Sequence, residues 1–471
     1  MRAPGAARWA ALVFLLAVAA WLATPAVPWL DDAFISLHSA QSVLAGGDPQ
    51  YGAPPLAGVT SPPYVLLLTT LLAAGVAPLP ALEAAGALGL AALALALWWL
   101  GRCLGLAGWR QLALPAAVLA AGQVVDQATN GVETGWAMAV AIVLVAATIA
   151  RAPLLAAAAA GILPWLRPDL APLAGLMFVA ALWPHPPRLR LQAAAIAAVA
   201  FLPWALWVYG DTGSWIPQTM AAKAAYFADG CQPLPLKAQV VGGALAAYSA
   251  LLIPASLLGL VFAVTSPHGR LLLLAAAVTV GAYLALLPGG LWHNYHRYLY
   301  PLLVPAIALG IGVSLKRPEF AWRIAAMAAI AVTILMWPMK RLPDAGEAME
   351  RLDAAAWVRE HIEPEARLLV QDAGVFAVFT SNPLVDFVGL KTPSSVAVHQ
   401  QITLPSCGSN RAAALAAIAR SSGADYLIVS AVWDTIFSLT AGLRREGVAL
   451  ELLRSPGNSP YDGYSVYQMR F

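Results

Sequence analysis

Two adjacent carboxylates, Asp31 and Asp32, directly follow the first apolar stretch of the chain, residues 9–30. Ionised groups at a bilayer surface cost free energy, so acids placed there usually serve a function. A carboxylate can take the proton of a hydroxyl group, and hard cations such as Mg²⁺, Mn²⁺ or Ca²⁺ prefer oxygen ligands. The simpler interpretation is that the pair ends a helix in water.

Further ionisable residues lie in stretches between apolar runs: Glu133, Arg167, Lys223, His293, His296 and Arg297. Arginine binds phosphate oxygens bidentately and lysine acts as a point charge, so these cations could hold a leaving phosphate. Alternatively, Lys223 and Arg297 extend to lipid headgroups, Arg167 begins a helix, and the two histidines anchor a helix end. His38, two turns after the acids, could face the same cavity.

The composition identifies a polytopic membrane protein. Hydrophobic residues make up 60% of the chain, charged residues 11%, and mean hydropathy is +0.72. A soluble domain carries about twice that charged fraction. Many apolar runs reach the ~20 residues needed to cross a bilayer. We expect no nucleic-acid partner.

The apolar runs predict 11 transmembrane helices. They cover residues 8–28, 82–101, 110–127, 132–150, 152–165, 168–183, 190–209, 238–264, 270–288, 297–315 and 320–338. Cytoplasmic loops concentrate Lys and Arg. All of the basic loops can face the cytoplasm only if the apolar run 62–76 does not cross the bilayer. We therefore predict that this run forms a juxtamembrane helix. The amino terminus is then inside, residues 31–81 form an external loop, and the carboxyl terminus is outside. The first run could instead be a cleaved signal peptide.

Composition changes near residue 339, which separates a membrane domain, 1–339, from a domain at 340–471. Strand-like runs at 367–370 and 426–429 alternate with helical patterns at 347–361 and 411–419, which predicts a small extracytoplasmic α/β domain. It contains no glycine fingerprint for nucleotides. Cys231 and Cys407 should both be external, either as a disulfide or as two free thiols.

Several short motifs resemble one family of membrane enzymes. They are Leu30-Asp-Asp-Ala-Phe-Ile-Ser36, Gly46-Gly47-Asp48-Pro49, Gly58-Val-Thr-Ser-Pro62, Gly131-Val-Glu-Thr134, Leu166-Arg-Pro-Asp169, Ile216-Pro-Gln-Thr219 with Lys223, Arg297-Tyr-Leu-Tyr-Pro301, and Asp372-Ala-Gly374 with Val385-Asp-Phe-Val-Gly-Leu390. Their order over nearly the whole chain resembles GT-C-type membrane glycosyltransferases, in particular the mycobacterial terminal arabinofuranosyltransferase group. Gln218 and Val132 replace the Asn and Met of that group, which leaves the donor specificity open.

The resemblance implies inverting transfer of a sugar, arabinofuranose being the family-based expectation, from a polyprenyl-phosphate donor. The acceptor is an extracytoplasmic glycan, lipid or protein, and the location is the bacterial cytoplasmic (inner) membrane. Asp31 is then the expected base, and Asp32 its partner or, with Asp31, the ligand of a divalent ion. Glu133 would orient the donor sugar, with His38 also in the cavity. The remaining expected roles are phosphate binding by Arg167, Lys223 and Arg297 and lining of the site by His293 and His296.

Two other functions are consistent with a polytopic protein that has an external domain. A transporter or flippase of lipid-linked sugars would place charged groups near the centres of its spans. The predicted span centres are nearly free of ionisable side chains, which favours chemistry at the outer surface. A non-catalytic scaffold that binds glycans would tolerate replacement of Asp31 by Asn.

Overall fold

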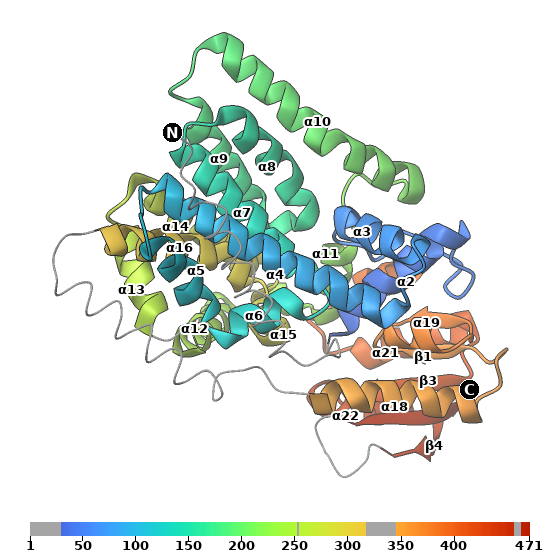
Figure 1. Cartoon of the computed structure of the whole chain (residues 1–471). Helices are drawn as coiled ribbons and strands as arrows, with labels where there is room; N and C mark the ends of the chain where they lie inside the picture. The colour runs from blue at the N-terminus through green and yellow to red at the C-terminus, as the bar shows by residue number, and fades with distance from the viewer. Residues whose placement is uncertain (1–29, 252–253, 317–344, 456–462) are drawn as a thin grey trace.

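The computed structural model describes residues 30–251, 254–316, 345–455 and 463–471. The expected first and last spans, 8–28 and 320–338, lie outside the described residues, as does the predicted domain boundary at 339/340. A helical part and a small sheet domain are present, so the expected combination of an apolar helical region with a carboxyl-terminal α/β domain is confirmed (Figure 1).

The helical part contains 15 described α-helices. They are α2 (Asp31–Ala45), α3 (Pro62–Ala73), α4 (Pro78–Cys103), α5 (Arg110–Leu119), α6 (Gly122–Thr129), α7 (Thr134–Ile149), α8 (Pro153–Leu166), α9 (Ala171–Leu182), α10 (Pro187–Thr212), α11 (Thr219–Phe227), α12 (Leu234–Leu251), α13 (Pro254–Ala263), α14 (Pro267–Leu286), α15 (His293–His296) and α16 (Leu299–Lys316). Several of the apolar helices, including α4, α10 and α14, begin with proline. Proline suits the first helical turn because its missing N–H would have no intrahelical partner there.

Four described helices are long and apolar enough to cross a membrane: α4, α10, α14 and α16. The expected single span 110–127 is instead the pair α5 and α6, bent by 74°. The expected span 238–264 is divided into α12 and α13. Helices α7, α8 and α9 are apolar but shorter. The described residues therefore fit a membrane protein, and the count of 11 spans stays a prediction.

The ambiguous run after the Asp pair forms the short helix α3. Its 12 residues are about 18 Å long, whereas the hydrocarbon core is about 30 Å thick. The helix ends before Gly75, whose φ of +84° is readily accessible to glycine. Because α7, α8 and α9 are also shorter than a full span, length alone does not decide the topology, and the juxtamembrane position of α3 stays a prediction.

The carboxyl-terminal domain contains a five-stranded sheet in the order β2-β1-β3-β5-β4. Strands β1 (Leu368–Val370), β2 (Leu384–Asp386) and β3 (Tyr426–Ser430) are parallel, and β5 (Tyr464–Arg470) pairs antiparallel with both β3 and β4 (Ala449–Arg454). The helices around it are α18 (Ala345–His361), α19 (Val375–Phe379), α20 (Pro393–Gln401), α21 (Arg411–Ser422), α22 (Ala431–Phe437) and α23 (Leu439–Arg445). The sequence predicted β1, β3, α18 and α21, but not the antiparallel pair.

The carboxyl-terminal domain packs directly on the segment that contains α2 and the loop after it (Figure 1). Phe34 and Leu37 of α2 share one apolar core with Val358 of α18 and Phe376 of α19. Phe34 also makes an edge contact with Phe379, with ring centroids 5.7 Å apart. Burial of this shared core removes large apolar surfaces of both parts from water, so the core holds them together.

Polar contacts fix the register of this interface. Lys391 Nζ lies 3.1 Å from Asp48 Oδ2, and both side chains are fully buried. Gln50 O accepts a hydrogen bond from the N–H of Leu384 at 2.9 Å, and Tyr51 Oη donates to Ala373 O at 2.6 Å. The position of the domain on the loop is therefore specified by directional bonds as well as by apolar contact.

Two further contacts join the carboxyl-terminal domain to the segment around α11. Cys231 and Cys407 form a disulfide with a Cα–Cα distance of 5.8 Å, which resolves the two alternatives that the sequence left open. Arg411 of α21 donates hydrogen bonds to the backbone oxygens of Tyr226 and Phe227, at 3.0 and 2.9 Å. Helix α11 is thus held between the membrane part and the carboxyl-terminal domain.

Replacing Lys391 by Met should destabilise the docked domain. The substitution leaves Asp48 as a buried charge without its cation, and breaking such a pair costs about 3–5 kcal/mol. The exposed pair between Arg470 and Glu451 gives the control, because loss of a surface ion pair costs about 1 kcal/mol or less. The full-length variants are heated in the presence of a protease, and cleavage of the carboxyl-terminal domain reports the temperature at which it is released. This temperature gives the loss of stability for each variant. Equal melting of the Lys391→Met and Arg470→Met proteins would contradict the proposed importance of the buried pair.

Candidate active site

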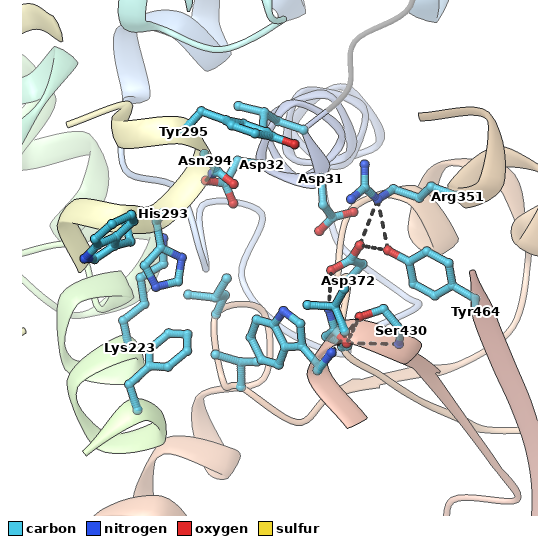
Figure 2. Close-up of a pocket in the computed structure, with 18 of the residues that line it drawn as sticks. Asp31, Asp32, Lys223, His293, Asn294, Tyr295, Arg351, Asp372, Ser430 and Tyr464 are labelled. Carbon is cyan, nitrogen blue, oxygen red and sulfur yellow. Dashed lines mark hydrogen bonds and ion pairs between the residues drawn. The ribbon is translucent and has the colours of Figure 1, made fainter. Parts of the chain in front are cut away.

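Asp31 and Asp32 occupy the first turn of α2, which begins after Leu30 in extended conformation. Negative charge near a helix amino terminus is favoured by the helix dipole. Adjacent helical residues point about 100° apart. The two carboxylates consequently diverge: Asp31 lies toward Asp372, and Asp32 lies beside Asn294 (Figure 2).

Asp31 is held by backbone N–H groups of the carboxyl-terminal domain. Its carboxylate accepts hydrogen bonds from Gly374 at 3.0 Å and from Val375 at 2.8 Å. A Cβ at position 374 would collide with the backbone of Asp31 and Ile35, so the close approach of α19 to α2 requires glycine here. Burial raises the pKa of Asp31, and the neighbouring Asp372 raises it further; Arg351 and the two N–H groups offset this only partly.

Asp32 lies in a cationic environment. Arg297 Nη2 approaches its Oδ2 at 2.8 Å, and Asn294 Nδ2 donates to the same oxygen at 3.3 Å. Burial alone would raise the pKa of Asp32, but the charges of Lys223 and Arg297 outweigh it and hold the pKa well below its usual value. A carboxylate with a depressed pKa is a weak base, so Asp31 is the better proton acceptor of the pair.

Lys223 and Arg297 meet at a residue that the sequence did not indicate, Tyr298. Lys223 Nζ donates a hydrogen bond to Tyr298 Oη at 3.0 Å. The Tyr298 ring centroid lies 4.5 Å from the guanidinium of Arg167, 5.4 Å from that of Arg297 and 5.8 Å from Lys223 Nζ. The ring face attracts cations and thereby holds three positive groups in a small volume.

The turn before α16 carries backbone strain. Asn294, Tyr295 and His296 have φ values of 51°, 55° and 62°, a left-handed conformation that non-glycine residues rarely adopt. Gln127 of α6, fully buried, donates to the backbone oxygen of Asn294 at 2.9 Å. Strain of this kind persists where the surroundings over-determine the backbone, and here it sets His293 and Asn294 on one side of Asp32.

His293 and His296 line the cavity with Asp31 and Asp32, whereas His38 does not. Burial, aided by Lys223, lowers the pKa of His293 to about 3, so this side chain is neutral at pH 7. His38 Nε2 lies 3.0 Å from Gln50 Oε1, in the interface between the loop and the carboxyl-terminal domain. His38 therefore does not line the cavity as expected, because its side-chain partner, Gln50, lies in the loop that follows α2.

Arg167 and Glu133 pair with each other, and neither lines the cavity that contains Asp31. Arg167 Nη1 lies 3.1 Å from Glu133 Oε1, and its other nitrogens bind both carboxylate oxygens of Asp169 at 3.1 and 3.0 Å. Arg167 is 1% exposed. Two carboxylates therefore occupy the guanidinium expected to bind phosphate, and Arg167 acts on the site through the Tyr298 ring. Glu133 borders a recess of about 30 Å³ behind Asp32, which Lys223 and Arg297 also line.

The main cavity, about 540 Å³, lies between the helical part and the carboxyl-terminal domain. One wall carries Asp31, Asp32, Lys223, His293 and Asn294 (Figure 2). The opposite wall was missed by the sequence reasoning; its polar residues are Arg351, Gln371, Asp372, Ser430 and Tyr464. The Asp372-Ala-Gly374 motif belongs to this wall and was part of the family resemblance, but the sequence did not indicate that Asp372 lines a cavity.

The donor set does not fit a divalent metal ion. Among the residues that the structure describes, no group of three or more His, Cys, Asp or Glu side chains is placed to hold one. The carboxylate of Asp32 already binds Arg297, and that of Asp31 accepts two backbone N–H groups. Mg²⁺ and Ca²⁺ require about six or more oxygen ligands. The proposed reaction therefore uses no metal ion.

The architecture resembles that of known GT-C-type enzymes. The structure of the arabinofuranosyltransferase AftD from mycobacteria matches with a TM-score of 0.50 and 17% identity, over 98% of this chain and 41% of AftD. The oligosaccharyltransferase of Archaeoglobus fulgidus gives 0.47 and 13%, over 97% of this chain and 72% of that one. The likeness to AftD confirms the GT-C-type fold expected from the sequence. This chain spans less than half of the length of AftD.

Sequence comparisons add one family match. A family model described as a domain of unknown function, DUF8728, covers residues 341–467, which is the carboxyl-terminal domain. No curated protein matches the chain in sequence.

Substituting Gly374 by Ala should separate α19 from α2. The new methyl group collides with backbone atoms that have no freedom to rotate away, and such overpacking costs about 1–3 kcal/mol. Gly175→Ala in α9 is the control, since its Cβ would meet nothing within 4 Å. Thermal unfolding of both full-length proteins tests the difference. A Gly374→Ala protein as stable as wild type would show that the two helices are not held this closely.

Proposed function

We propose that the protein is an inverting glycosyltransferase that moves a sugar from a polyprenyl-phosphate donor to an acceptor hydroxyl at the outer face of the bacterial cytoplasmic membrane. The carrying observation is that a carboxylate with a raised pKa, Asp31, shares one cavity with Lys223 and with Asp32, whose carboxylate is paired with Arg297. Arabinofuranose is the proposed sugar, on the resemblance of the sequence motifs.

The opposite charges suit the two ends of such a reaction. The acceptor hydroxyl must lose a proton, and a carboxylate with a raised pKa is a stronger base for that proton than an ordinary one. The departing phosphate gains negative charge, which preorganised cations stabilise in a site shielded from water. Lys223 lines both this cavity and the recess behind Asp32, and Arg297 lines the recess, so the positive end extends away from Asp31. Asp32 keeps these cations in place through its 2.8 Å ion pair with Arg297.

The proposed reaction is a single displacement. Asp31 takes the proton of the acceptor hydroxyl, and the hydroxyl oxygen attacks the anomeric carbon on the face opposite the phosphate. The bond between that carbon and the phosphate oxygen breaks, and the polyprenyl phosphate leaves with the bonding electron pair. Attack from the opposite face inverts the anomeric configuration. The donor is proposed to be lipid-linked because no nucleotide-sugar pool exists outside the cytoplasm.

The two alternative functions predict different arrangements. A flippase would need charged groups near the middle of its spans. The buried Arg167 lies between the end of α8 and the start of α9, rather than within a long span. A glycan-binding scaffold would need neither the raised pKa of Asp31 nor the cations opposite it. The charge arrangement therefore favours the transferase.

Replacing Asp31 by Asn should abolish most of the turnover. The amide keeps the shape of the side chain but cannot accept the hydroxyl proton, and loss of such a base lowers rates by about 10²–10⁴-fold. Transfer is measured in membranes with radiolabelled prenyl-phosphate sugars and a panel of acceptors. The control Glu451→Gln makes the same change on the exposed strand β4. Full turnover by Asp31→Asn would reject its role as base.

The pH profile of transfer should show an acidic limb set by Asp31. Protonated Asp31 cannot accept a proton, so activity rises with pH as the group ionises. Because burial and Asp372 raise the pKa of Asp31, activity should be lost at a higher pH than for an ordinary carboxyl of pKa about 4. Asp372→Asn removes one negative neighbour and should move the limb to lower pH. A limb that does not move would contradict the coupling between the two acids.

A further inference from the structure

We infer that the carboxyl-terminal domain provides the acceptor subsite, and that the acceptor group bound there is a neutral saccharide. This inference rests on the proposed function and deepens it, because the proposed reaction requires an acceptor hydroxyl of unspecified chemistry. The relevant wall of the 540 Å³ cavity carries Asp372, Gln371, Ser430, Tyr464 and Trp433.

The charge of this wall excludes an anionic acceptor. Its cation, Arg351, places Nε 2.8 Å from Asp372 Oδ2, so its charge is balanced within the wall. The other polar groups are a carboxylate, an amide and two hydroxyls, and Asp31 adds a further carboxylate at the boundary between the two walls. A phosphate or uronate on this wall would meet acids without a spare cation, since Lys223 lies on the opposite wall at the donor end. Sugar hydroxyls, which both donate and accept hydrogen bonds, match such a set.

The polar groups of the wall are fixed before any ligand arrives. Asp372 accepts hydrogen bonds from Arg351, Tyr464 and Gln371 (Figure 2). Gln371 Oε1 in turn accepts from the N–H and the hydroxyl of Ser430, at 3.1 and 3.0 Å. A carboxylate has about four acceptor sites, so Asp372 retains capacity for one substrate hydroxyl. Preorganised groups of this kind lower the entropy cost of binding a flexible saccharide.

The same wall offers an apolar surface for a sugar ring. Trp433 of α22 lines the cavity together with Val388, Leu390 and Val432. Trp433 is supported from behind by the Tyr226 ring, whose centroid lies 5.3 Å away. The apolar face of a pyranose or furanose ring packs on such an indole, while its hydroxyls reach the polar groups beside it.

The placement of Asp31 links this wall to the chemistry. The N–H groups that bind Asp31 belong to Gly374 and Val375, two and three residues after Asp372 in the chain. A saccharide bound against Asp372 and Trp433 therefore presents a hydroxyl toward Asp31, with the cations of the donor end beyond Asp32. The carboxyl-terminal domain thereby determines which hydroxyl meets the base.

The subsite is tested by binding, with the full-length protein in lipid nanodiscs. An array of neutral oligosaccharides, uronate-containing oligosaccharides and short peptides is screened, and the best neutral saccharide is titrated by calorimetry. We expect binding of a neutral saccharide, a loss of at least tenfold in affinity in Val432→Trp, which fills the cavity, and a similar loss in Asp372→Asn. Ile436→Ala, on the exposed face of the same helix α22, should bind like wild type.

Several outcomes would overturn the inference: wild type binds no saccharide, it binds only uronates or peptides, or Val432→Trp and Asp372→Asn bind as wild type does. Thermal unfolding identifies a variant that has lost its fold. Saccharide binding by the remaining folded variant then tests the inference. Failure of the proposed function is separate, because it shows as undiminished transfer by Asp31→Asn with saccharide binding intact. Saccharide binding that survives in both Val432→Trp and Asp372→Asn, with transfer abolished in Asp31→Asn, rejects the subsite alone.

Discussion

The contact between the first turn of α2 and the start of α19 is the constraint on which the site depends. It brings a carboxylate from near the start of the chain to backbone N–H groups of the carboxyl-terminal domain. The absence of a side chain at Gly374 permits this distance, and the shared core around Phe34 and Phe376 maintains it. Without this contact, Asp31 would be a solvated residue at a helix end, with an ordinary pKa and only one wall beside it.

Charge separation within the cavity follows from the same arrangement. Asp31 and Asp32 are adjacent in sequence, yet helical geometry sends them to different neighbours. Asp32 faces Arg297 and Lys223, whereas Asp31 faces Asp372. Two identical side chains thus acquire opposite shifts in pKa from their surroundings alone. The Tyr298 ring concentrates the cations, and the strained turn at 294–296 sets Asn294 against Asp32.

The residues whose proximity could be anticipated from sequence were those that stand out against an apolar background; their roles stay predictions. Asp31, Asp32, Lys223 and Arg297 were visible because charge is rare in this region, and the structure brings them together. Positive-charge parity likewise indicated the short helix α3. Arg351, Asp372 and Tyr464 were missed because polar residues are ordinary in an α/β domain, and their proximity to Asp31 arises from long-range packing that leaves no local signal. Arg167 and His38 were placed in the cavity because their partners, Glu133, Asp169 and Gln50, could not be deduced from spacing.

The disulfide between Cys231 and Cys407 bears on how the chain matures. The two residues are 176 positions apart, and Cys231 closely follows the helix that carries Lys223. The covalent bond can close only after synthesis has passed Cys407, which lies near the end of the chain. The lysine-bearing helix is therefore fastened late, after the membrane part and most of the carboxyl-terminal domain have been synthesised.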